Sequence, residues 1–238
     1  MTVLKRLNLE PETQAKLAKL GAGSGRLGKR PPALFISSGI TQVDKLTGGI
    51  PRGGITLVVG PPSSGRTTLM NSALSAAVSS GEVCAVVDAS DAFHPASAEA
   101  AGVDLERLLW VRCGGNVSHT ITAAEIILQG GGFGLVVLDL GTITEGSLIP
   151  DSTWFRYRRA VENSPTCLLV IGTETLSVSC ASLVLEMEAA KPRWGGKPGA
   201  PSIANPLLGL ELTIKQRKPF SRARPVKVIT SMGHEIPD

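Results

Sequence analysis

The sequence predicts an α/β protein with a mainly parallel sheet flanked by helices and with antiparallel strands added at its C-terminal edge. Short apolar runs alternate with helical segments along most of the chain, as in folds built from strand-helix-strand units. The 27 glycines and 16 prolines, against only 4% aromatic residues, favour many strand-to-helix turns over an aromatic-rich β-sandwich. After about residue 191 the pattern becomes the alternation typical of antiparallel strands.

Six continuous apolar runs are predicted to be strands buried on both faces of the sheet. They are residues 55–59, 83–87, 108–111, 135–138, 167–171 and 183–185. Helices are predicted at 67–78, 95–101, 122–129 and 153–162. Strands that alternate with helices indicate right-handed strand-helix-strand crossovers, so this order predicts a mainly parallel sheet.

The two ends of the chain differ from this middle. Residues 208–215 and 225–230 are predicted to be the antiparallel edge strands, and the stretch KPRWGGKPGAPS before them is predicted to be a loop. Near the N-terminus, Glu10–Leu20 is predicted to be a short helix ended by Gly21, and 21–32 a flexible basic linker. We therefore expect a helix and linker over 1–35 and a single folded core over 36–238.

Composition excludes several classes of protein. No apolar run reaches the roughly 18 residues that cross a bilayer, and the N-terminus lacks the layout of a signal peptide, so we expect a cytoplasmic protein without membrane contact. The four cysteines show no CxxC spacing, which argues against a zinc site or a disulfide framework. Cys84 and Cys167 lie in apolar runs and are expected to be buried free thiols.

Charge is distributed unevenly behind the formal net charge of +4. Residues 36–190 are weakly acidic, with eight Lys/Arg against fifteen Asp/Glu, whereas both ends are basic. The basic ends are candidates for contact with DNA phosphates, and the alternative is that they are solvated tails. The candidate DNA-binding residues are Lys215, Arg217, Lys218, Arg222 and Arg224.

A candidate phosphate-binding loop follows the first apolar run directly. It fits G-x-x-x-x-G-K-[ST] at every position except the lysine, which is replaced by Arg66. Two glycines let the backbone curl so that N–H groups face phosphate oxygens, and the next helix directs its positive end there. The alternative is a loop that joins strand to helix without a ligand. The candidate residues are Gly60, Pro61, Pro62, Ser63, Ser64, Gly65, Arg66, Thr67 and Thr68.

A magnesium site is predicted beside this loop, with ATP and Mg²⁺ as the candidate cofactors. Thr67 has the position of a metal-ligating hydroxyl, and Asp139 follows the apolar run 135–138 as the second ligand. The alternative for Asp139 is a carboxylate that caps the turn after its strand. Arg66 keeps the positive charge of a lysine but is bulkier and forked, so hydrolysis is in question.

These motifs resemble the RecA recombinase family over about Ser38 to Ile229. GGIPRGGITLVVGPPSSGRTTL is similar to that family's stretch around the phosphate loop, VCAVVDASDAFHPASAEAAGVDLERLLWV to the following strand, helix and strand, and LVVLDL to the magnesium strand. ELTIKQRKPFSRARPVKV resembles the basic strand pair that ends the family's core. The resemblance implies a RecA-like P-loop core that binds nucleotide.

The departures from that family concern hydrolysis and DNA binding. Ser90 stands where the family places a water-activating glutamate two residues after the aspartate matched by Asp88, and Glu174 replaces a glutamine that senses the γ-phosphate. The intervals matching the family's two DNA-binding loops, 141–152 and 175–181, contain no lysine or arginine. We therefore assign no catalytic residue and expect little or no ATP hydrolysis.

The reduced core is similar to the ImuA group, RecA-related accessory proteins of SOS mutagenesis and translesion synthesis. That resemblance implies RecA and an ImuB-type translesion polymerase complex as partners. Two alternatives stay open: an active DNA-dependent ATPase of homologous recombination, and a SulA-like inhibitor of cell division.

The densest aromatic and basic cluster, around residues 154–159, has two interpretations. It could stack on bases or dock a partner. Helical spacing instead favours Trp154 and Tyr157 packing on the sheet, with Arg156 and Arg159 solvated.

Overall fold

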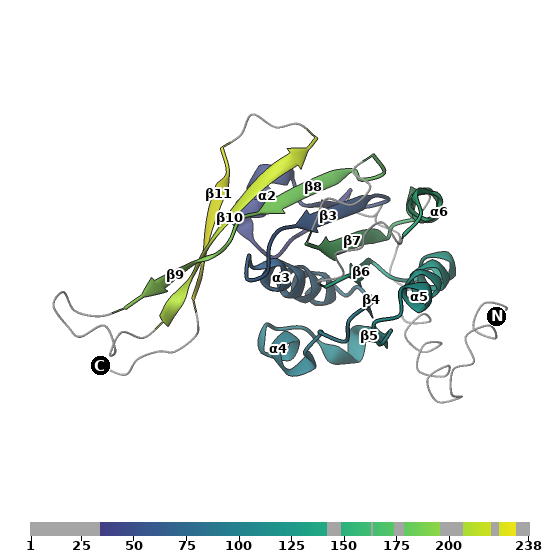
Figure 1. The fold of residues 1–238 in the computed structure, drawn as a ribbon, viewed down its shortest axis with the longest axis horizontal. Helices are drawn as coiled ribbons and strands as arrows, with labels where there is room; N and C mark the ends of the chain where they lie inside the picture. The colour runs from purple at the N-terminus through teal and green to yellow at the C-terminus, as the bar shows by residue number, and fades with distance from the viewer. Residues whose placement is uncertain are drawn as a thin grey trace.

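A large mixed sheet with helices on both faces organises the chain in the computed structural model (Figure 1). The structure describes residues 34–141, 149–162, 164–173, 179–195, 207–219 and 224–231. The strands of the large sheet are β3 (Ile55–Val59), β4 (Cys84–Asp88), β5 (Leu108–Arg112), β6 (Leu135–Asp139), β7 (Cys167–Gly172), β8 (Leu183–Met187), β9 (Lys191–Trp194), β10 (Leu207–Lys218) and β11 (Val226–Ser231). A separate pair is formed by β1 (Phe35–Ile36) and β2 (Ile50–Pro51).

The strand order confirms the predicted fold class. It runs β11-β10-β8-β3-β7-β6-β4-β5, with β9 paired to β10. All pairs from β8 to β5 are parallel, whereas β10 pairs antiparallel with β8, β9 and β11. In-register pairing aligns Val59 with Gly172 and Asp88 with Asp139, so the carboxyl ends of these four strands meet at one edge.

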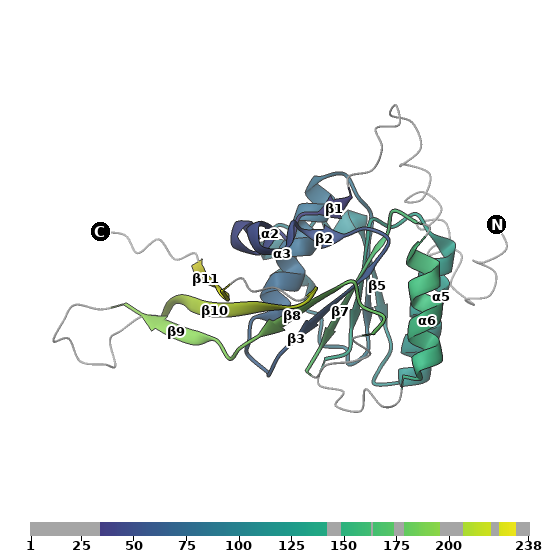
Figure 2. The same cartoon turned by 90° about the horizontal axis from the view of Figure 1, so that it is seen from above.

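Helices cover both faces of the sheet, and Figure 2 shows the strands between the two layers. One layer holds α2 (Thr41–Thr47), α3 (Arg66–Ser79) and α4 (Pro95–Ala100), and the other holds α5 (Val117–Gly130) and α6 (Asp151–Glu162). Within the described residues, no helix has the length and apolar character needed to span a membrane.

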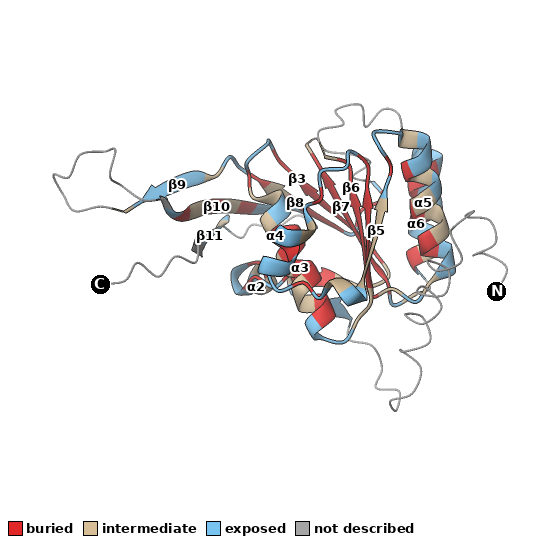
Figure 3. Cartoon of the chain, turned by 90° about the horizontal axis from the view of Figure 1, so that it is seen from below, coloured by how far each residue is buried: buried red, intermediate tan, exposed pale blue. Residues whose placement is uncertain are grey.

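Two hydrophobic clusters, one on each face, form the core (Figure 3). Alternate residues of a strand belong to opposite clusters: Leu57 packs toward α5 and α6, whereas Val58 packs toward α3. Burial on both faces explains why these strands are continuous apolar runs in the sequence.

Two aromatic residues of the cluster on α6 are part of this core, whereas Phe155 is exposed. Trp154 and Tyr157 are buried, with their rings in an edge-on contact at a centroid distance of 5.8 Å. The Tyr157 hydroxyl donates a hydrogen bond to the Ile121 carbonyl at 3.0 Å. Arg156 and Arg159 are exposed, so the packing interpretation is confirmed.

The four cysteines are buried free thiols, as predicted for Cys84 and Cys167. Burial raises the pKa of each of these two to about 12, so both stay protonated at neutral pH. Among the described residues no group of three or more His, Cys, Asp or Glu side chains is placed to hold a metal ion.

Two sequence predictions need correction, and some short elements were not predicted. The helix predicted at 122–129 begins earlier, at Val117, because the Asn116 side chain caps it by accepting the His119 N–H at 3.0 Å. Part of the predicted loop KPRWGGKPGAPS is strand β9, in which Pro192 is tolerated at the edge of the sheet. The short helix α2 and the pair β1–β2 were not predicted. The predicted helix 10–20 and linker 21–32 lie outside the described residues.

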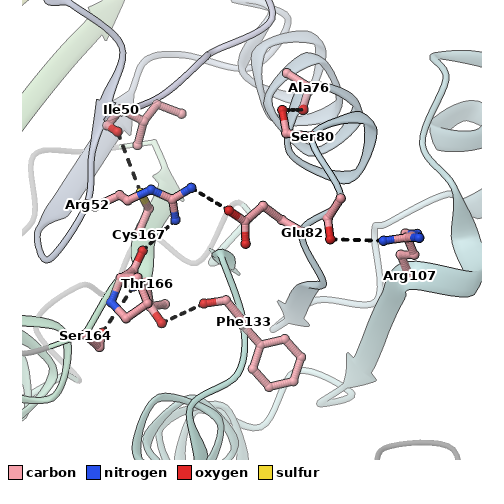
Figure 4. Close-up of polar contacts among 12 residues, drawn as sticks. Ile50, Arg52, Ala76, Ser80, Glu82, Arg107, Phe133, Ser164, Thr166 and Cys167 are labelled. Atoms are coloured by element: carbon pink, nitrogen blue, oxygen red, sulfur yellow. Dashed lines mark hydrogen bonds and ion pairs between the residues drawn. The ribbon is translucent and has the colours of Figure 1, made fainter. Parts of the chain in front are cut away.

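Polar contacts hold together the turns at the amino-terminal edge of the sheet (Figure 4). Arg52 Nη2 pairs with Glu82 Oε1 at 2.5 Å, and Arg52 Nη1 donates to the Pro165 carbonyl at 2.8 Å. The Thr166 hydroxyl donates to the Phe133 carbonyl at 2.7 Å. These contacts join the turns before β3, β4, β6 and β7, and so support the register that the opposite edge depends on.

Candidate nucleotide site

The loop between β3 and α3 has the curled backbone that the motif predicts. Ser63 and Gly65 adopt left-handed conformations, with φ of 60° and 88°. A Cβ on Gly60 would collide with the Met187 carbonyl oxygen, and one on Gly65 would lie 2.6 Å from Leu212. Both motif positions therefore require glycine, for close approach to neighbouring strands and for backbone conformation.

This loop offers hydrogen-bond donors to an anion. The first turn of α3, which is 14 residues long, has N–H groups without intrahelical acceptors and contains no acidic residue. The Ser64 side chain is buried, and its hydroxyl has no hydrogen-bond partner within the described structure. An unpaired hydroxyl beside free N–H groups fits a phosphate, whose oxygens accept from both. The motif residues 60–68 thus form one cradle.

Asp139 lies at the same edge, separated from the loop's strand by β7 alone. It is 7% exposed, and its Oδ1 accepts the Gly141 N–H at 2.9 Å, so it caps the turn after β6. Burial raises the pKa of Asp139, and the charge of Asp88 adds to this, while Arg66 opposes it. Thr67 is exposed at the start of α3. A hydroxyl and a carboxylate are hard oxygen ligands of the kind Mg²⁺ prefers.

Arg66 extends from the loop toward the turn that follows Asp139. Its Nη1 donates to the Gly141 carbonyl at 3.4 Å, a long hydrogen bond. Partial burial lowers the pKa of Arg66, whereas the negative charge of Asp139 raises it. The guanidinium therefore lies within electrostatic range of the candidate metal ligand.

Asp88 organises the turn after β4, a role that the sequence reasoning did not assign. Its carboxylate is fully buried and accepts the N–H groups of Ser90, Ala92 and Phe93 at 3.3, 3.1 and 2.9 Å. The Trp110 indole also donates to it, at 3.2 Å. An aspartate at the end of a strand, with a bulky donor on the neighbouring strand, is the signal that could have indicated this.

Ser90 is placed beside the Asp139 turn by these bonds. A Cβ added to Gly141 would collide with the Ser90 hydroxyl, so the two residues are packed against each other. The adjacent carboxylate, Asp91, points elsewhere: it pairs with Arg112 at 2.9 Å and accepts the Gly114 N–H at 3.2 Å. These two bonds, that to Gly114 foremost, lower the pKa of Asp91. The side chain that packs on Gly141, in the turn after Asp139, is thus a hydroxyl and not an acid.

Thr173 is a further polar residue at this edge that the sequence reasoning missed. It follows β7, between the strands of the loop and of Asp139. Its hydroxyl is buried without a partner in the described part of the chain, so it is available to a ligand. Glu174 lies outside the described residues.

Three of the basic candidates for DNA contact, Lys215, Arg217 and Lys218, lie on β10, and two of them have partners within the protein. Arg217 pairs with Glu186 at 2.9 Å, at an irregularity of the strand, and Lys218 donates to the Ser179 carbonyl at 3.2 Å. Lys215 and Arg224 are exposed. Arg222 lies outside the described residues. Part of the positive charge is therefore neutralised within the protein.

Comparison with known proteins supports the fold and the loop together. The family model of the RecA N-terminal domain matches residues 20–151, more than half of the chain. Protein RecA of Chlorobaculum tepidum is 37% identical over 141 residues, covering 57% of this chain and 40% of the relative. Protein RecA of Corynebacterium diphtheriae is 38% identical over 118 residues, covering 48% and 32%. The matched stretch is thus less than half of each relative.

A solved structure extends the likeness of fold to most of the chain. The crystal structure of the RadB recombinase superposes with a TM-score of 0.59 at 17% identity. The superposition covers 83% of this chain and 96% of the other. The likeness reaches beyond the residues that the RecA N-terminal model matches.

Asp139→Asn is expected to stabilise the protein at neutral pH. Because burial raises the pKa of Asp139 above its unfolded value, ionisation costs stability as pH rises from the ordinary value of 3.8 through the raised folded value. Asparagine keeps the oxygen that accepts the Gly141 N–H and removes the buried charge. We expect the Tm at pH 7 to rise by about 2–4 °C, with the difference shrinking near pH 4.

Thermal unfolding followed by circular dichroism at several pH values measures this. Glu99→Gln, an exposed carboxylate on α4, is the control and should leave Tm unchanged. A lower Tm for Asp139→Asn at pH 7 would show that the carboxylate is stabilised in the fold.

Proposed function

The chain belongs to the RecA family, and on that premise we propose that it is an accessory protein of DNA repair and mutagenesis, of the ImuA type. In this proposal it binds ATP at the cradle of residues 60–68 and hydrolyses it little or not at all. It acts by binding partner proteins, with DNA contact through its basic ends. The relatives matched over part of their length are named RecA, which supports a role in recombination and repair.

The proposal of little or no hydrolysis rests on Ser90, which packs on the turn after Asp139. Activating water for attack on a phosphate needs a base within reach, and a serine hydroxyl is not a base at neutral pH. Ser90 packs against Gly141, and Asp91 is bound to Arg112 and Gly114. The site therefore has donors for the phosphates but, within the described structure, no carboxylate placed to activate water.

Backbone and side-chain groups around the loop would bind the nucleotide. The N–H groups of the loop and the Ser64 hydroxyl would hold phosphate oxygens, and Thr67 with Asp139 would hold Mg²⁺. A bound Mg²⁺ would supply positive charge that offsets the charge of the phosphates. Arg66 would add a fixed positive charge next to the same oxygens.

A gain-of-function variant tests the hydrolysis claim. Arg66→Lys combined with Ser90→Glu restores the residue types of an active site, and we expect steady ATP turnover to rise at least about tenfold, a modest share of what a general base contributes. Arg66→Lys combined with Ser118→Glu is the matched control, since Ser118 is exposed on α5. Phosphate release with and without single-stranded DNA is the measurement. Steady DNA-stimulated turnover by the wild type, lost in Asp139→Ala, would instead support the active-ATPase alternative.

The partner claim concerns RecA and an ImuB-type translesion polymerase complex. We expect purified RecA to be retained by this protein in a pull-down, more strongly with ATP than without. A P-loop ATPase outside the RecA family serves as the control bait. Retention of neither RecA nor the polymerase complex, with or without ATP, would contradict the proposal. Retention of a cell-division protein instead would favour the SulA-like alternative.

DNA contact is proposed at Lys215, Arg217, Lys218, Arg222 and Arg224. Changing all five to alanine should reduce the salt dependence of single-stranded DNA binding. Five phosphate contacts would contribute about 3.5 to the slope of log K against log salt, and we expect about 2–3 because Glu186 already engages Arg217. Changing Arg156, Arg158 and Arg159 on α6 to alanine is the control and should leave the slope unchanged. Equal slopes for the wild type and the five-fold variant would leave the cluster as a solvated surface.

A further inference from the structure

A positively charged side chain, that of Arg66, reaches from the phosphate loop to the turn that Asp139 caps. The Arg66 guanidinium crosses from the phosphate loop to the turn after β6, where its Nη1 contacts the Gly141 carbonyl at 3.4 Å. The N–H of the same Gly141 is bound by Asp139 at 2.9 Å. Arg66 and Asp139 are therefore connected through one residue, and their charges act on each other.

The Arg66 guanidinium matters for charge balance because Asp139 lies beside a second buried carboxylate. Asp139 is nearly buried, and its register partner on β4 is Asp88, also buried and acidic. Asp88 satisfies its oxygens with four N–H donors. Two carboxylates at one strand edge would repel a triphosphate. Among the described residues, Arg66 is the cation whose charge offsets Asp139.

We propose that the Arg66 guanidinium takes the place of the divalent cation in this site, so that the protein binds nucleotide without requiring Mg²⁺. This inference rests on nucleotide binding at the loop as proposed above. The guanidinium has five N–H donors in a planar fork. One donor keeps the Gly141 carbonyl while the others bond phosphate oxygens, as a metal would join the Asp139 side to the phosphates.

The same placement weakens the hold of Thr67 and Asp139 on a metal ion, so that a metal can bind but is not needed. A divalent cation held between Thr67 and Asp139 would lie near a guanidinium of like charge, and the repulsion is only partly screened at a half-buried position. A lysine would act differently, because its compact ammonium is a point charge without a fork. Arg66→Lys should therefore keep a positive charge near the phosphates but lose the simultaneous hydrogen bond to the Gly141 carbonyl.

The test is the affinity for a fluorescent ATP analogue, measured in excess MgCl₂ and in EDTA. We expect the wild-type Kd to change by less than about threefold between the two, and the Kd of Arg66→Lys to rise more than about tenfold in EDTA. Arg158→Lys, an exposed residue of α6, is the matched control and should behave as the wild type. The Tm of each variant without nucleotide shows that it is folded.

Asp139→Asn gives an independent readout of opposite sign. If Asp139 is the counter-ion of Arg66, its neutralisation frees the guanidinium for phosphate, and binding in EDTA should tighten by about two- to fivefold. If Asp139 is essential as a metal ligand, the variant should bind more weakly in MgCl₂.

The outcomes distinguish the role proposed for Arg66 from nucleotide binding itself. A wild type that binds the analogue in MgCl₂ but loses it in EDTA, as Arg66→Lys does, would overturn the role of Arg66 and leave nucleotide binding intact. Failure of every folded variant to bind under either condition would overturn both the nucleotide site and this inference.

Discussion

The in-register parallel pairing of β3, β7, β6 and β4 is the constraint on which the rest of the structure depends. It brings the phosphate loop, Thr173, Asp139 and the turn after Asp88 to a single edge, although they are far apart in sequence. At the opposite edge, Arg52 and Glu82 tie the turns that begin these strands. A slip of one residue would move the buried side chains to the wrong face, so burial on both faces fixes the register. The packing of the core thus determines which residues lie at the carboxyl ends of these strands.

The charge balance at that edge is the basis of our proposal that this protein binds nucleotide with little or no hydrolysis. Asp139 is buried at a cost reflected in its raised pKa, and Arg66 offsets part of that charge from the phosphate loop. The other acidic side chains nearby are already bonded: Asp88 to backbone N–H groups and the Trp110 indole, Asp91 to Arg112 and Gly114. Ser90 takes the place next to the Asp139 turn. These contacts support the proposal of a site that holds phosphates without activating water.

The sequence predicted the strands well because burial on both faces makes them continuous apolar runs, and β3 has the predicted bounds. It also predicted that the loop 60–68 and Asp139 lie where their strands end, since each follows such a run directly, and their role in binding nucleotide stays a prediction. Short elements were missed for a physical reason: α2 is held by Asp44 accepting the Ser38 N–H, and β9 exists because it pairs with β10. The contact of Arg66 with Gly141, 75 positions away, and the bonds around Asp88 depend on the folded arrangement. No local pattern encodes them, so they had to come from the structure.

The site we propose holds nucleotide with little or no hydrolysis. The most direct measurement is a single-turnover experiment with the protein in excess over radiolabelled ATP, in which bound nucleotide is separated from free and identified over time. We expect labelled ATP to be retained by the protein and recovered unchanged, with or without single-stranded DNA. Conversion of the bound label to ADP at a rate that DNA increases would contradict this expectation, as would the failure of any label to be retained.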